Sequence, residues 1–386
     1  MVEAATITGP VKALLMFSKV ARRGLDGHGS IEHTLLTTVR RRREIGGADN
    51  EMLRAAASDG LEVDVAPERF VFDPGVLLHM ARCIRTRAPD IVETHDFKSH
   101  FLLWLLRRAG VVTRPRWVAF HHGYTKMSLQ VRLFQKLDRL SLRHADKVVT
   151  LCQPFVRQLG LLGVASDRIA VIRNAVAPKQ RPTEAALALF RTALGLVSTD
   201  TVIVSVGRLS REKGHADLIR AFRALIEERP QENYRLVLVG DGSARAELVA
   251  AASDLGDRVL FVGHQPDPWP YFCMANLFVL PSHTEGSPLV LFEAMAAGLP
   301  IIATAVGGVP EVVQSGVDAI LVPPKNISRL TRALAELLSD SAGRSALGAA
   351  AQNMARACSP EAYASRLLSV YVDVISADHA TAPIVS

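Results

Sequence analysis

The chain of 386 residues is long for a single hydrophobic core and sufficient for two domains. Its 49% hydrophobic and 22% charged residues are typical of an ordinary globular protein, and no apolar run approaches the roughly 18 residues that a membrane-spanning helix requires. The net charge of +7 is uneven, because residues 1–180 hold 28 Lys and Arg against 17 Asp and Glu (+11), whereas residues 181–386 hold 17 against 21 (−4).

In the first half of the chain, short β-branched runs alternate with longer helical stretches. Ile31, Leu35 and Val39 recur at helical spacing and predict a helix over 29–43. The alternation predicts a parallel sheet that is covered by helices on both faces. The expected strands are 12–17, 61–65, 91–94, 117–121, 147–151 and 169–172, and the expected helices include 77–87 and 129–144.

A polar, Pro-rich stretch over 175–183 interrupts this alternation and is typical of a connection between domains. The alternation then restarts, so we expect an α/β protein of two doubly wound, Rossmann-like domains, 1–180 and 181–365. A C-terminal helix or tail over 366–386 would pack back on the first domain. The expected elements of the second domain are strands 201–206, 234–239, 258–262, 277–280, 301–304 and 319–322 and helices 215–228 and 244–255.

A loop with two basic residues follows the strand predicted at 201–206. Gly207 lets the backbone approach a ligand closely, Arg208 offers a planar fork for phosphate oxygens, and Lys213 adds a point charge. Ligands of open α/β sheets bind beyond the carboxyl ends of the strands, where this loop lies. The loop therefore predicts a diphosphate clamp, against the alternative of solvated surface charges.

A second loop, after the strand at 277–280, carries two glutamates. Glu285 precedes a predicted helix, for which Ser287 is the expected N-cap and Pro288 the expected first residue, and Glu293 lies in its second turn. The free N–H groups of the helix start suit a pyrophosphate. The carboxylates suit sugar and ribose hydroxyls; the alternative is an acidic surface helix. The expected ligand-binding positions around the helix start are Gly286, Ser287, Pro288, Leu289 and Val290.

Three weaker signals also follow predicted strands of the second domain. Gly240 and the pair Gly263-His264 would let a nucleotide base lie against backbone. Residues 307–311 repeat the arrangement of glycines before a helix start, a pattern that ordinary turn chemistry also produces.

Taken in order, these residues resemble family four of the glycosyltransferases, a retaining group with the GT-B fold of two Rossmann-like domains that face a cleft. The resemblance covers most of the chain and is strongest over 204–324. It implies that Arg208 and Lys213 neutralise the departing diphosphate, that Glu285 contacts the donor sugar, and that Glu293 binds the ribose hydroxyls. The resemblance also implies that a departing phosphate oxygen takes the acceptor proton. Because no Asp-x-Asp pair stands at a strand end, we expect no metal site and no cofactor besides the nucleotide-sugar co-substrate.

The first domain resembles the family less closely. Residues 27–32 keep glycines and a glutamate in altered order, and Ala175 stands where the family usually has glycine. Family members often place a histidine that faces the donor sugar after a strand of this domain. We prefer His122, because a glycine follows it, and His121 remains the alternative. Thr94, His95 and Asp96, which end another strand, are weaker candidates for the lining of an acceptor pocket.

The predicted function is retaining transfer of a sugar from a nucleoside-diphosphate-sugar to an acceptor hydroxyl. The expected acceptor is a lipid-linked saccharide or glycolipid in polysaccharide or lipopolysaccharide synthesis. The basic first half, including residues 40–43, would approach an anionic membrane surface. The alternatives are a GT-B phosphorylase or sugar-nucleotide epimerase, or a nucleic-acid-binding protein, which the 6% aromatic content and the lack of a recognition motif disfavour.

The cysteines and the N-terminus bear on the compartment. Cys83, Cys152, Cys273 and Cys358 form no CxxC pair, which argues against a disulfide framework or a zinc site. The first residues lack the features of a signal peptide. We therefore expect a cytoplasmic protein, with peripheral attachment to the inner face of the membrane as a further hypothesis.

Overall fold

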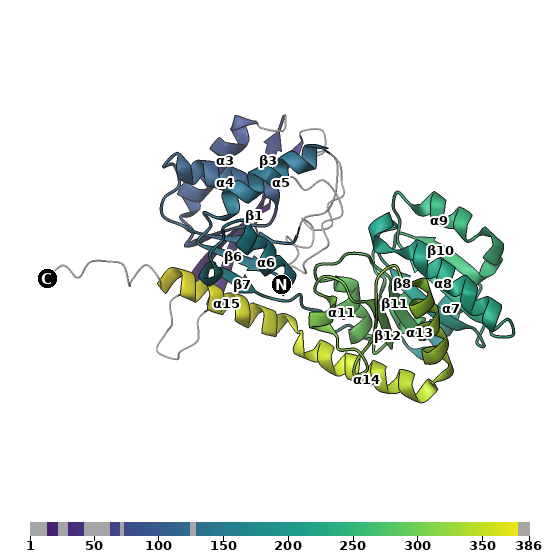
Figure 1. The fold of residues 1–386 in the computed structure, drawn as a ribbon. Coiled ribbons are helices and arrows are strands. Elements are labelled where there is room, and N and C mark those ends of the chain that lie inside the picture. The colour runs from purple at the N-terminus through teal and green to yellow at the C-terminus, as the bar shows by residue number, and fades with distance from the viewer. Residues whose placement is uncertain (1–13, 22–29, 42–61, 70–72, 124–128, 377–386) are drawn as a thin grey trace. The chain divides into compact units, whose positions relative to one another are not determined.

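The computed structural model describes residues 14–21, 30–41, 62–69, 73–123 and 129–376. The chain forms two compact units (Figure 1). The first comprises residues 1–173 and 363–386, and the second comprises residues 174–362. Sequence reasoning placed the corresponding boundaries after residues 180 and 365. No helix among the described residues has the length and apolar composition needed to cross a membrane.

The first unit is built on a seven-stranded sheet with the order β3-β2-β1-β4-β5-β6-β7. β1 pairs antiparallel with both β2 and β4, and the remaining neighbours are parallel. The strands are β1 (Leu14–Ala21), β2 (Ser30–Arg41), β3 (Val63–Glu68), β4 (Ile91–Thr94), β5 (Arg116–His121), β6 (Lys147–Thr150) and β7 (Ile169–Val171), and the helices among them are α3 (Pro74–Arg87), α4 (Phe97–Arg108), α5 (Leu129–Leu142), α6 (Gln153–Leu161) and the short 3-10 helix η1 (Ser166–Arg168).

The prediction of a helix over 29–43 is wrong, because Ser30–Arg41 forms strand β2. Five of its twelve residues are β-branched, and such side chains favour extended backbone. Pairing with β1 on one side and β3 on the other supplies the backbone hydrogen bonds. β1 and β2 run antiparallel, so the expected parallel sheet is mixed here. The basic run at 40–43 therefore does not follow an amphipathic helix: Arg40 and Arg41 end β2, and 42–43 lie outside the described residues.

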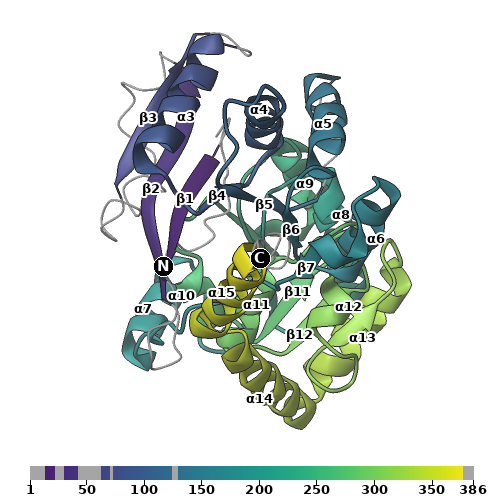
Figure 2. The same ribbon diagram turned by 90° about the vertical axis from the view of Figure 1, so that its left-hand side faces the viewer.

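The C-terminal helix α15 (Pro360–Ser376) covers the first unit's sheet (Figure 2). Leu367, Val370, Tyr371 and Val374 recur at helical spacing and form one buried stripe. This stripe packs on alternate residues of the central strands, namely Ile91 of β4, Val118 and Phe120 of β5 and Val149 of β6. The core of the first unit therefore includes chain from both ends of the sequence.

His100 of α4 and Asp138 of α5 form a fully buried pair in the first unit. His100 Nδ1 lies 2.5 Å from Asp138 Oδ1, and its Nε2 lies 3.1 Å from the carbonyl oxygen of Thr94. Burial alone would lower the pKa of His100, but the charge and hydrogen bond of Asp138 outweigh it, and the pKa is raised. The folded state thus binds this proton more tightly than the unfolded state. The pair contributes its full stability below the unfolded pKa and loses it as the pH rises through the folded pKa.

We expect Asp138→Asn to destabilise the first unit by about 2 kcal/mol at mildly acidic pH, because the substitution leaves a buried imidazolium without its counter-charge. The difference in the free energy of unfolding between the variant and the wild type should decrease as the pH rises and His100 becomes neutral. Thermal unfolding over a pH series measures this. Asp146→Asn is the control, since Asp146 pairs with Arg107 and Arg116 and contacts no histidine among the described residues. If the stability lost in Asp138→Asn does not change with pH, the conclusion that Asp138 stabilises a protonated His100 is contradicted.

The second unit is built on a six-stranded parallel sheet with the order β10-β9-β8-β11-β12-β13 (Figure 1). Its strands are apolar on both faces: Val202 and Val204 pack in one core cluster, while Ile203 between them packs in the other. The strands are β8 (Thr201–Val206), β9 (Tyr234–Val239), β10 (Val259–Gly263), β11 (Leu277–Leu280), β12 (Ile301–Thr304) and β13 (Ile320–Val322).

Helices cover both faces of this sheet. The 3-10 helix η2 (Arg211–Lys213) leads directly into α8, and the helix predicted at 244–255 ends earlier than expected, at Ala251, and is followed by the 3-10 segment η3. The helices are α7 (Glu184–Ala193), α8 (His215–Glu228), α9 (Arg245–Ala251), η3 (Ser253–Arg258), α10 (Trp269–Met274), α11 (Leu289–Ala296), α12 (Val309–Val312), α13 (Ile327–Ser339) and α14 (Ser341–Ala357).

Candidate functional site

Four loops of the second unit lie next to one another at the carboxyl edge of its sheet. They follow the neighbouring strands β9, β8, β11 and β12, so the parallel order brings them to a single edge. Two contacts between them require glycine. A Cβ on Gly240 would lie 1.9 Å from the carbonyl oxygen of Gly207, and one on Gly214 would lie 2.0 Å from that of Pro281. The backbones of adjacent loops therefore touch without side chains between them.

The Glu285 carboxylate is held at the centre of this edge. Its Oε1 accepts hydrogen bonds from Lys213 Nζ at 2.7 Å and from Ser282 Oγ at 2.6 Å. The side chain of Glu285 is 6% exposed and that of Lys213 22% exposed. Gly307, with φ +54°, passes so close that a Cβ on it would lie 1.6 Å from the carbonyl oxygen of Glu285. The loops after β8, β11 and β12 thus converge on one residue, Glu285: the first two through its carboxylate and the third through its backbone.

The structure brings Lys213 and Glu285 together. From the sequence, we assigned Lys213 to the departing diphosphate and Glu285 to the donor sugar. The two assignments are compatible, because a lysine ammonium has three N–H donors and Glu285 occupies one of them. Their roles toward a ligand stay predictions. Sequence reasoning missed Ser282, for which the available signal was a hydroxyl three residues before the glutamate in the same loop.

Arg208 lies in the loop after β8, directly beyond Gly207, whose φ of +156° is in a region that favours glycine. Its side chain is exposed, and its guanidinium makes no hydrogen bond to any residue that the structure describes. The Arg208 guanidinium is therefore available to an anionic ligand. The backbone of its loop is held at Gly207 by close contact with Gly240.

Helix α11 starts one residue later than predicted. Pro288, with ψ of 118°, is the N-cap instead of Ser287, and no side chain caps the helix, so Leu289 is its first residue. The prediction of Ser287 as N-cap is thus wrong: its hydroxyl is buried and has no hydrogen-bond partner among the described residues. Its carbonyl oxygen instead accepts a hydrogen bond from Asn174 Nδ2 at 2.7 Å. A buried hydroxyl and an uncapped helix start, side by side, are polar groups that a bound anion would satisfy.

The remaining predicted residues of the second unit occupy the same edge of the sheet. Glu293 lies one turn into α11 and is half-buried. Gly286 accepts a backbone hydrogen bond from Gly308 at 3.0 Å, which joins the loops after β11 and β12. Gly263, with φ +75°, accepts one from Gly240 at 2.8 Å, and the exposed His264 follows it.

The two candidate histidines of the first unit differ in their surroundings. His121 is buried at the end of β5, with its ring edge-on to Phe155 and its Nε2 3.3 Å from Gln158 Oε1. Burial lowers the pKa of His121. His122 is exposed, and its ring stacks at 6.0 Å from that of His95. Desolvation of its ring and the nearby charge of His95 lower the pKa of His122 to about 3. By surface area, His122 is still the more exposed residue of the two.

The residues beside His95 have structural partners. Thr94 Oγ1 accepts a hydrogen bond from Trp117 Nε1 at 2.7 Å, and the Asp96 carboxylate caps the start of α4. The His95 ring stacks on Phe120 with ring centroids 4.3 Å apart. Of the three residues proposed for an acceptor pocket, Thr94 and Asp96 thus already have hydrogen-bond partners within the first unit.

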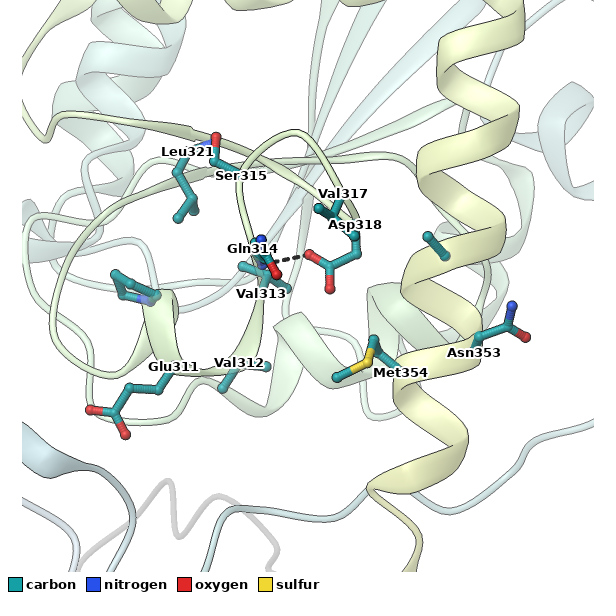
Figure 3. A pocket seen from close by; sticks show the side chains of 12 residues that line it. Glu311, Val312, Val313, Gln314, Ser315, Val317, Asp318, Leu321, Asn353 and Met354 are labelled. Atoms are coloured by element: carbon teal, nitrogen blue, oxygen red, sulfur yellow. Dashed lines mark hydrogen bonds between the residues drawn. The ribbon is translucent and has the colours of Figure 1, made fainter.

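A separate groove of about 670 Å³ lies in the second unit between α12, the turn before β13 and α14 (Figure 3). Val317, Leu321 and Met354 give it an apolar lining, and the buried Asp318 accepts a hydrogen bond from the Gln314 backbone at 2.6 Å. Burial raises the pKa of Asp318. Of the loops singled out in the sequence, only residues 310 and 311 of the weakest signal line this groove, and none of the residues assigned to the donor does, so we place the site at the carboxyl edge of the sheet.

Models of known protein families match both halves of the chain. Residues 189–354 match the glycosyl transferases group 1, and residues 21–175 match the glycosyl transferase 4-like domain. The chain belongs to the group 1 glycosyl transferases. The loops that converge on Glu285 lie within the first of the two matched ranges, and the candidate histidines lie within the second.

Named relatives match four-fifths or more of the chain. A D-inositol 3-phosphate glycosyltransferase of Thermobispora bispora is 29% identical over an alignment of 400 positions, which covers 86% of this chain and 90% of the relative. An N-acetyl-alpha-D-glucosaminyl L-malate synthase of Bacillus anthracis is 25% identical over 80% of this chain and 81% of its own. Anabaena HepE, solved in complex with UDP, is similar in fold, with a TM-score of 0.72 at 19% identity over 84% of this chain and 90% of its own.

These matches confirm the predicted family, the α/β fold with two Rossmann-like domains and the class of enzyme. This group 1 glycosyl transferase is thus a transferase of sugars, and the predicted residues of its second unit gather at one edge of a parallel sheet.

Proposed function

We propose that the enzyme transfers a sugar, with retention of anomeric configuration, from a nucleoside-diphosphate-sugar to an acceptor hydroxyl. The observation that carries the proposal is the convergence of three loops on the Lys213–Glu285 pair, next to the uncapped start of α11. Cationic groups and free N–H groups beside a sequestered carboxylate suit a ligand that is anionic at one end and rich in hydroxyls at the other.

The diphosphate would lie at the start of α11. Backbone N–H groups at Leu289 and Val290 and the hydroxyl of Ser287 would donate to phosphate oxygens, and Arg208 would reach them from the loop after β8. Anabaena HepE, which is similar in fold, was solved in complex with UDP and with UDP-glucose, which supports a nucleotide-sugar as the ligand.

The carboxylates would bind the two sugars of the donor. Glu285 would accept hydrogen bonds from hydroxyls of the transferred sugar, and Glu293 from the ribose hydroxyls. A carboxylate that already accepts from Lys213 and Ser282 is fixed in position before the donor arrives, so its alignment costs little on binding.

In the reaction, the bond between the anomeric carbon and the phosphate oxygen breaks, and a bond from that carbon to the acceptor oxygen forms on the same face. The acceptor proton passes to the departing phosphate oxygen. Lys213 and Arg208 would stabilise the charge that develops on the diphosphate. This division of roles needs no catalytic metal ion, and we propose a metal-independent reaction.

For the acceptor, we propose a molecule that carries phosphate or carboxylate groups. The net charge of +11 over residues 1–180 supports this, as do relatives named for inositol 3-phosphate and malate. A lipid-linked saccharide with a pyrophosphate at the inner face of the membrane has the same chemistry. Transfer assays with inositol phosphate, malate and a lipid-pyrophosphate saccharide distinguish these sources.

The donor half is tested by a thermal-shift screen of UDP, GDP and ADP sugars. One nucleotide-sugar should raise the melting temperature of the wild type. Glu293→Ala should weaken its binding about 10- to 100-fold, because two hydrogen bonds to a charged group are lost. Glu336→Ala, at an exposed position of α13, is the matched control and should bind like the wild type. If no nucleotide-sugar stabilises the wild type, or if the sugar is released by phosphate without any acceptor, the proposal fails.

A further inference from the structure

Three side chains that are typical metal ligands meet at the edge of the first unit's sheet. Asp64 lies on the edge strand β3, and His79 and Cys83 lie on α3. Cys83 Sγ is 3.5 Å from both Asp64 Oδ2 and His79 Nε2, and the His79 and Asp64 atoms are in direct contact. Among the described residues, this is the place where one atom from each of three such side chains lies within 4.8 Å of the others.

The fold produces this cluster through regular geometry. Positions 79 and 83 are four apart on α3 and so project from one face of the helix. Val76, Met80 and Ile84 of the same helix are buried in the core of the first unit, which fixes the rotation of α3 about its axis. In Figures 1 and 2, α3 lies beside β3. The three side chains therefore come from two elements whose relative position the core already sets.

We propose that Asp64, His79 and Cys83 bind a zinc ion that joins the edge strand β3 to helix α3. Thiolate, imidazole and carboxylate are the ligands that zinc takes in proteins, with Zn–S about 2.3 Å and Zn–N about 2.0–2.1 Å. At tetrahedral angles, these bond lengths place sulfur and nitrogen about 3.6 Å apart. The observed separation of 3.5 Å between Cys83 Sγ and His79 Nε2 matches that value.

Accommodating the ion requires one adjustment. The contact between the imidazole and the carboxylate is shorter than the roughly 3.4 Å edge of a tetrahedral site. Asp64 is partly exposed, with 32% of its side-chain surface accessible, so rotation of its carboxylate opens the space. Three protein ligands leave a fourth position for water.

The rival interpretation of the same cluster is a nucleophilic cysteine activated by a histidine. That role requires a stabilised thiolate. Instead, one of the groups nearest the sulfur is a carboxylate, that of Asp64, whose Oδ2 lies 3.5 Å from Cys83 Sγ and whose negative charge disfavours a thiolate. The geometry suits a cation, which the negative carboxylate attracts.

This site revises the expectation of no zinc site, which rested on the absence of CxxC pairs. The site includes no residue assigned to the donor or to the leaving group, so the proposed metal-independent transfer reaction stands unchanged. The proposal therefore stands independently of the proposed function.

The test uses the full chain, stripped of metal with a chelator and then titrated with zinc chloride in a calorimeter. We expect one zinc ion per chain and a rise in melting temperature with zinc. Cys83→Ser and His79→Gln should each weaken binding at least about 100-fold, because each removes a direct ligand. Cys358→Ser and His144→Gln, at positions outside the cluster, should bind like the wild type.

A spectroscopic measurement guards against variants that fail to fold. Cobalt(II) added to the stripped wild type should give a thiolate-to-cobalt charge-transfer band together with visible bands of tetrahedral intensity, and zinc should displace both. The proposal is overturned if the wild type shows no stoichiometric binding, if the cobalt spectrum lacks the thiolate band, or if folded Cys83→Ser binds zinc as tightly as Cys358→Ser does.

Discussion

Replacing Lys213 with alanine should lower the rate of sugar transfer about 1,000-fold, or about 4 kcal/mol in activation free energy. The reason is electrostatic: the lysine sits at the edge of a buried carboxylate and donates to Glu285 at 2.7 Å, leaving two N–H donors for the departing diphosphate. Steady-state kinetics with a donor identified by thermal shift, at saturating donor and acceptor, measures the change in kcat.

The control for Lys213→Ala is Lys179→Ala in the same unit. Lys179 pairs with the exposed Asp267 at 3.1 Å, and its removal should leave kcat within about twofold of the wild type. Since Lys213→Ala also removes an ion-pair partner of Glu285, the melting temperature of each variant is recorded alongside. A folded Lys213→Ala enzyme that keeps more than a tenth of the wild-type kcat would refute the assignment of Lys213 to the leaving group.

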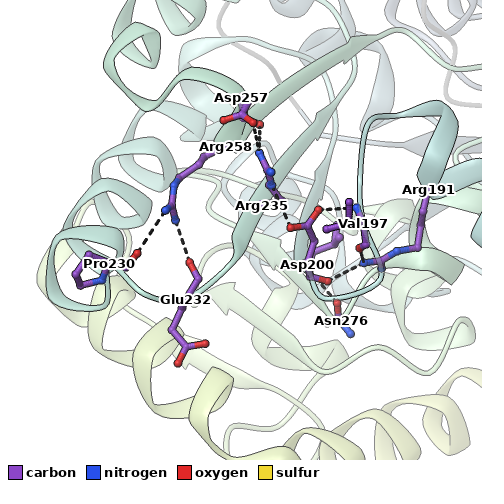
Figure 4. Close-up of polar contacts among 10 residues, drawn as sticks. Arg191, Val197, Asp200, Pro230, Glu232, Arg235, Asp257, Arg258 and Asn276 are labelled. Atoms are coloured by element: carbon purple, nitrogen blue, oxygen red, sulfur yellow. Dashed lines mark hydrogen bonds and ion pairs between the residues drawn. The ribbon is translucent and has the colours of Figure 1, made fainter.

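Asp200→Ala should destabilise the second unit by about 3 kcal/mol, since it breaks a buried ionic network at the amino end of β8 (Figure 4). The carboxylate is 2% exposed and accepts hydrogen bonds from the Val197 backbone at 2.8 Å and from Arg235 Nε at 3.3 Å. Removing it leaves a partly buried guanidinium and an N–H group without this acceptor. Chemical denaturation followed by tryptophan fluorescence measures the loss, because Trp269 reports on the second unit.

The second carboxylate on the same arginine is the matched control. Asp257 pairs with Arg235 Nη1 at 2.8 Å but is 85% exposed, so Asp257→Ala should cost less than about 1 kcal/mol. Equal costs for the two variants would show that the burial of Asp200 does not determine the strength of the network.

The second unit could be predicted well from the sequence because its strands are buried on both faces. Strands β8, β11 and β12 have the expected bounds, since continuous apolar runs that adjoin a glycine or proline at one end leave little ambiguity. Ser30–Arg41 could not be assigned in the same way. Apolar residues spaced by four fit a helix, and only pairing with β1 and β3 shows that the segment is extended.

The site was predictable where a single loop carries the signal, as with Lys213 and Glu285. It was not predictable where the signal arises from the packing of distant segments. The missing partner of the Ser287 hydroxyl depends on the exact start of α11, and the meeting of Asp64 with His79 and Cys83 depends on how an edge strand lies against a helix. Neither relationship is local in the sequence.

The placement of α15 has a consequence for how the protein is made. The first unit takes its sheet from residues 14–171 and its buried helix from residues 363–376, so about 190 residues are synthesised between them. The second unit is continuous and can fold as soon as it leaves the ribosome, while the apolar face formed by Ile91, Val118 and Val149 waits for the last segment of the chain. Translation that stops short of α15 would therefore leave this apolar face of the first unit uncovered, and exposed surface of that kind is prone to aggregation.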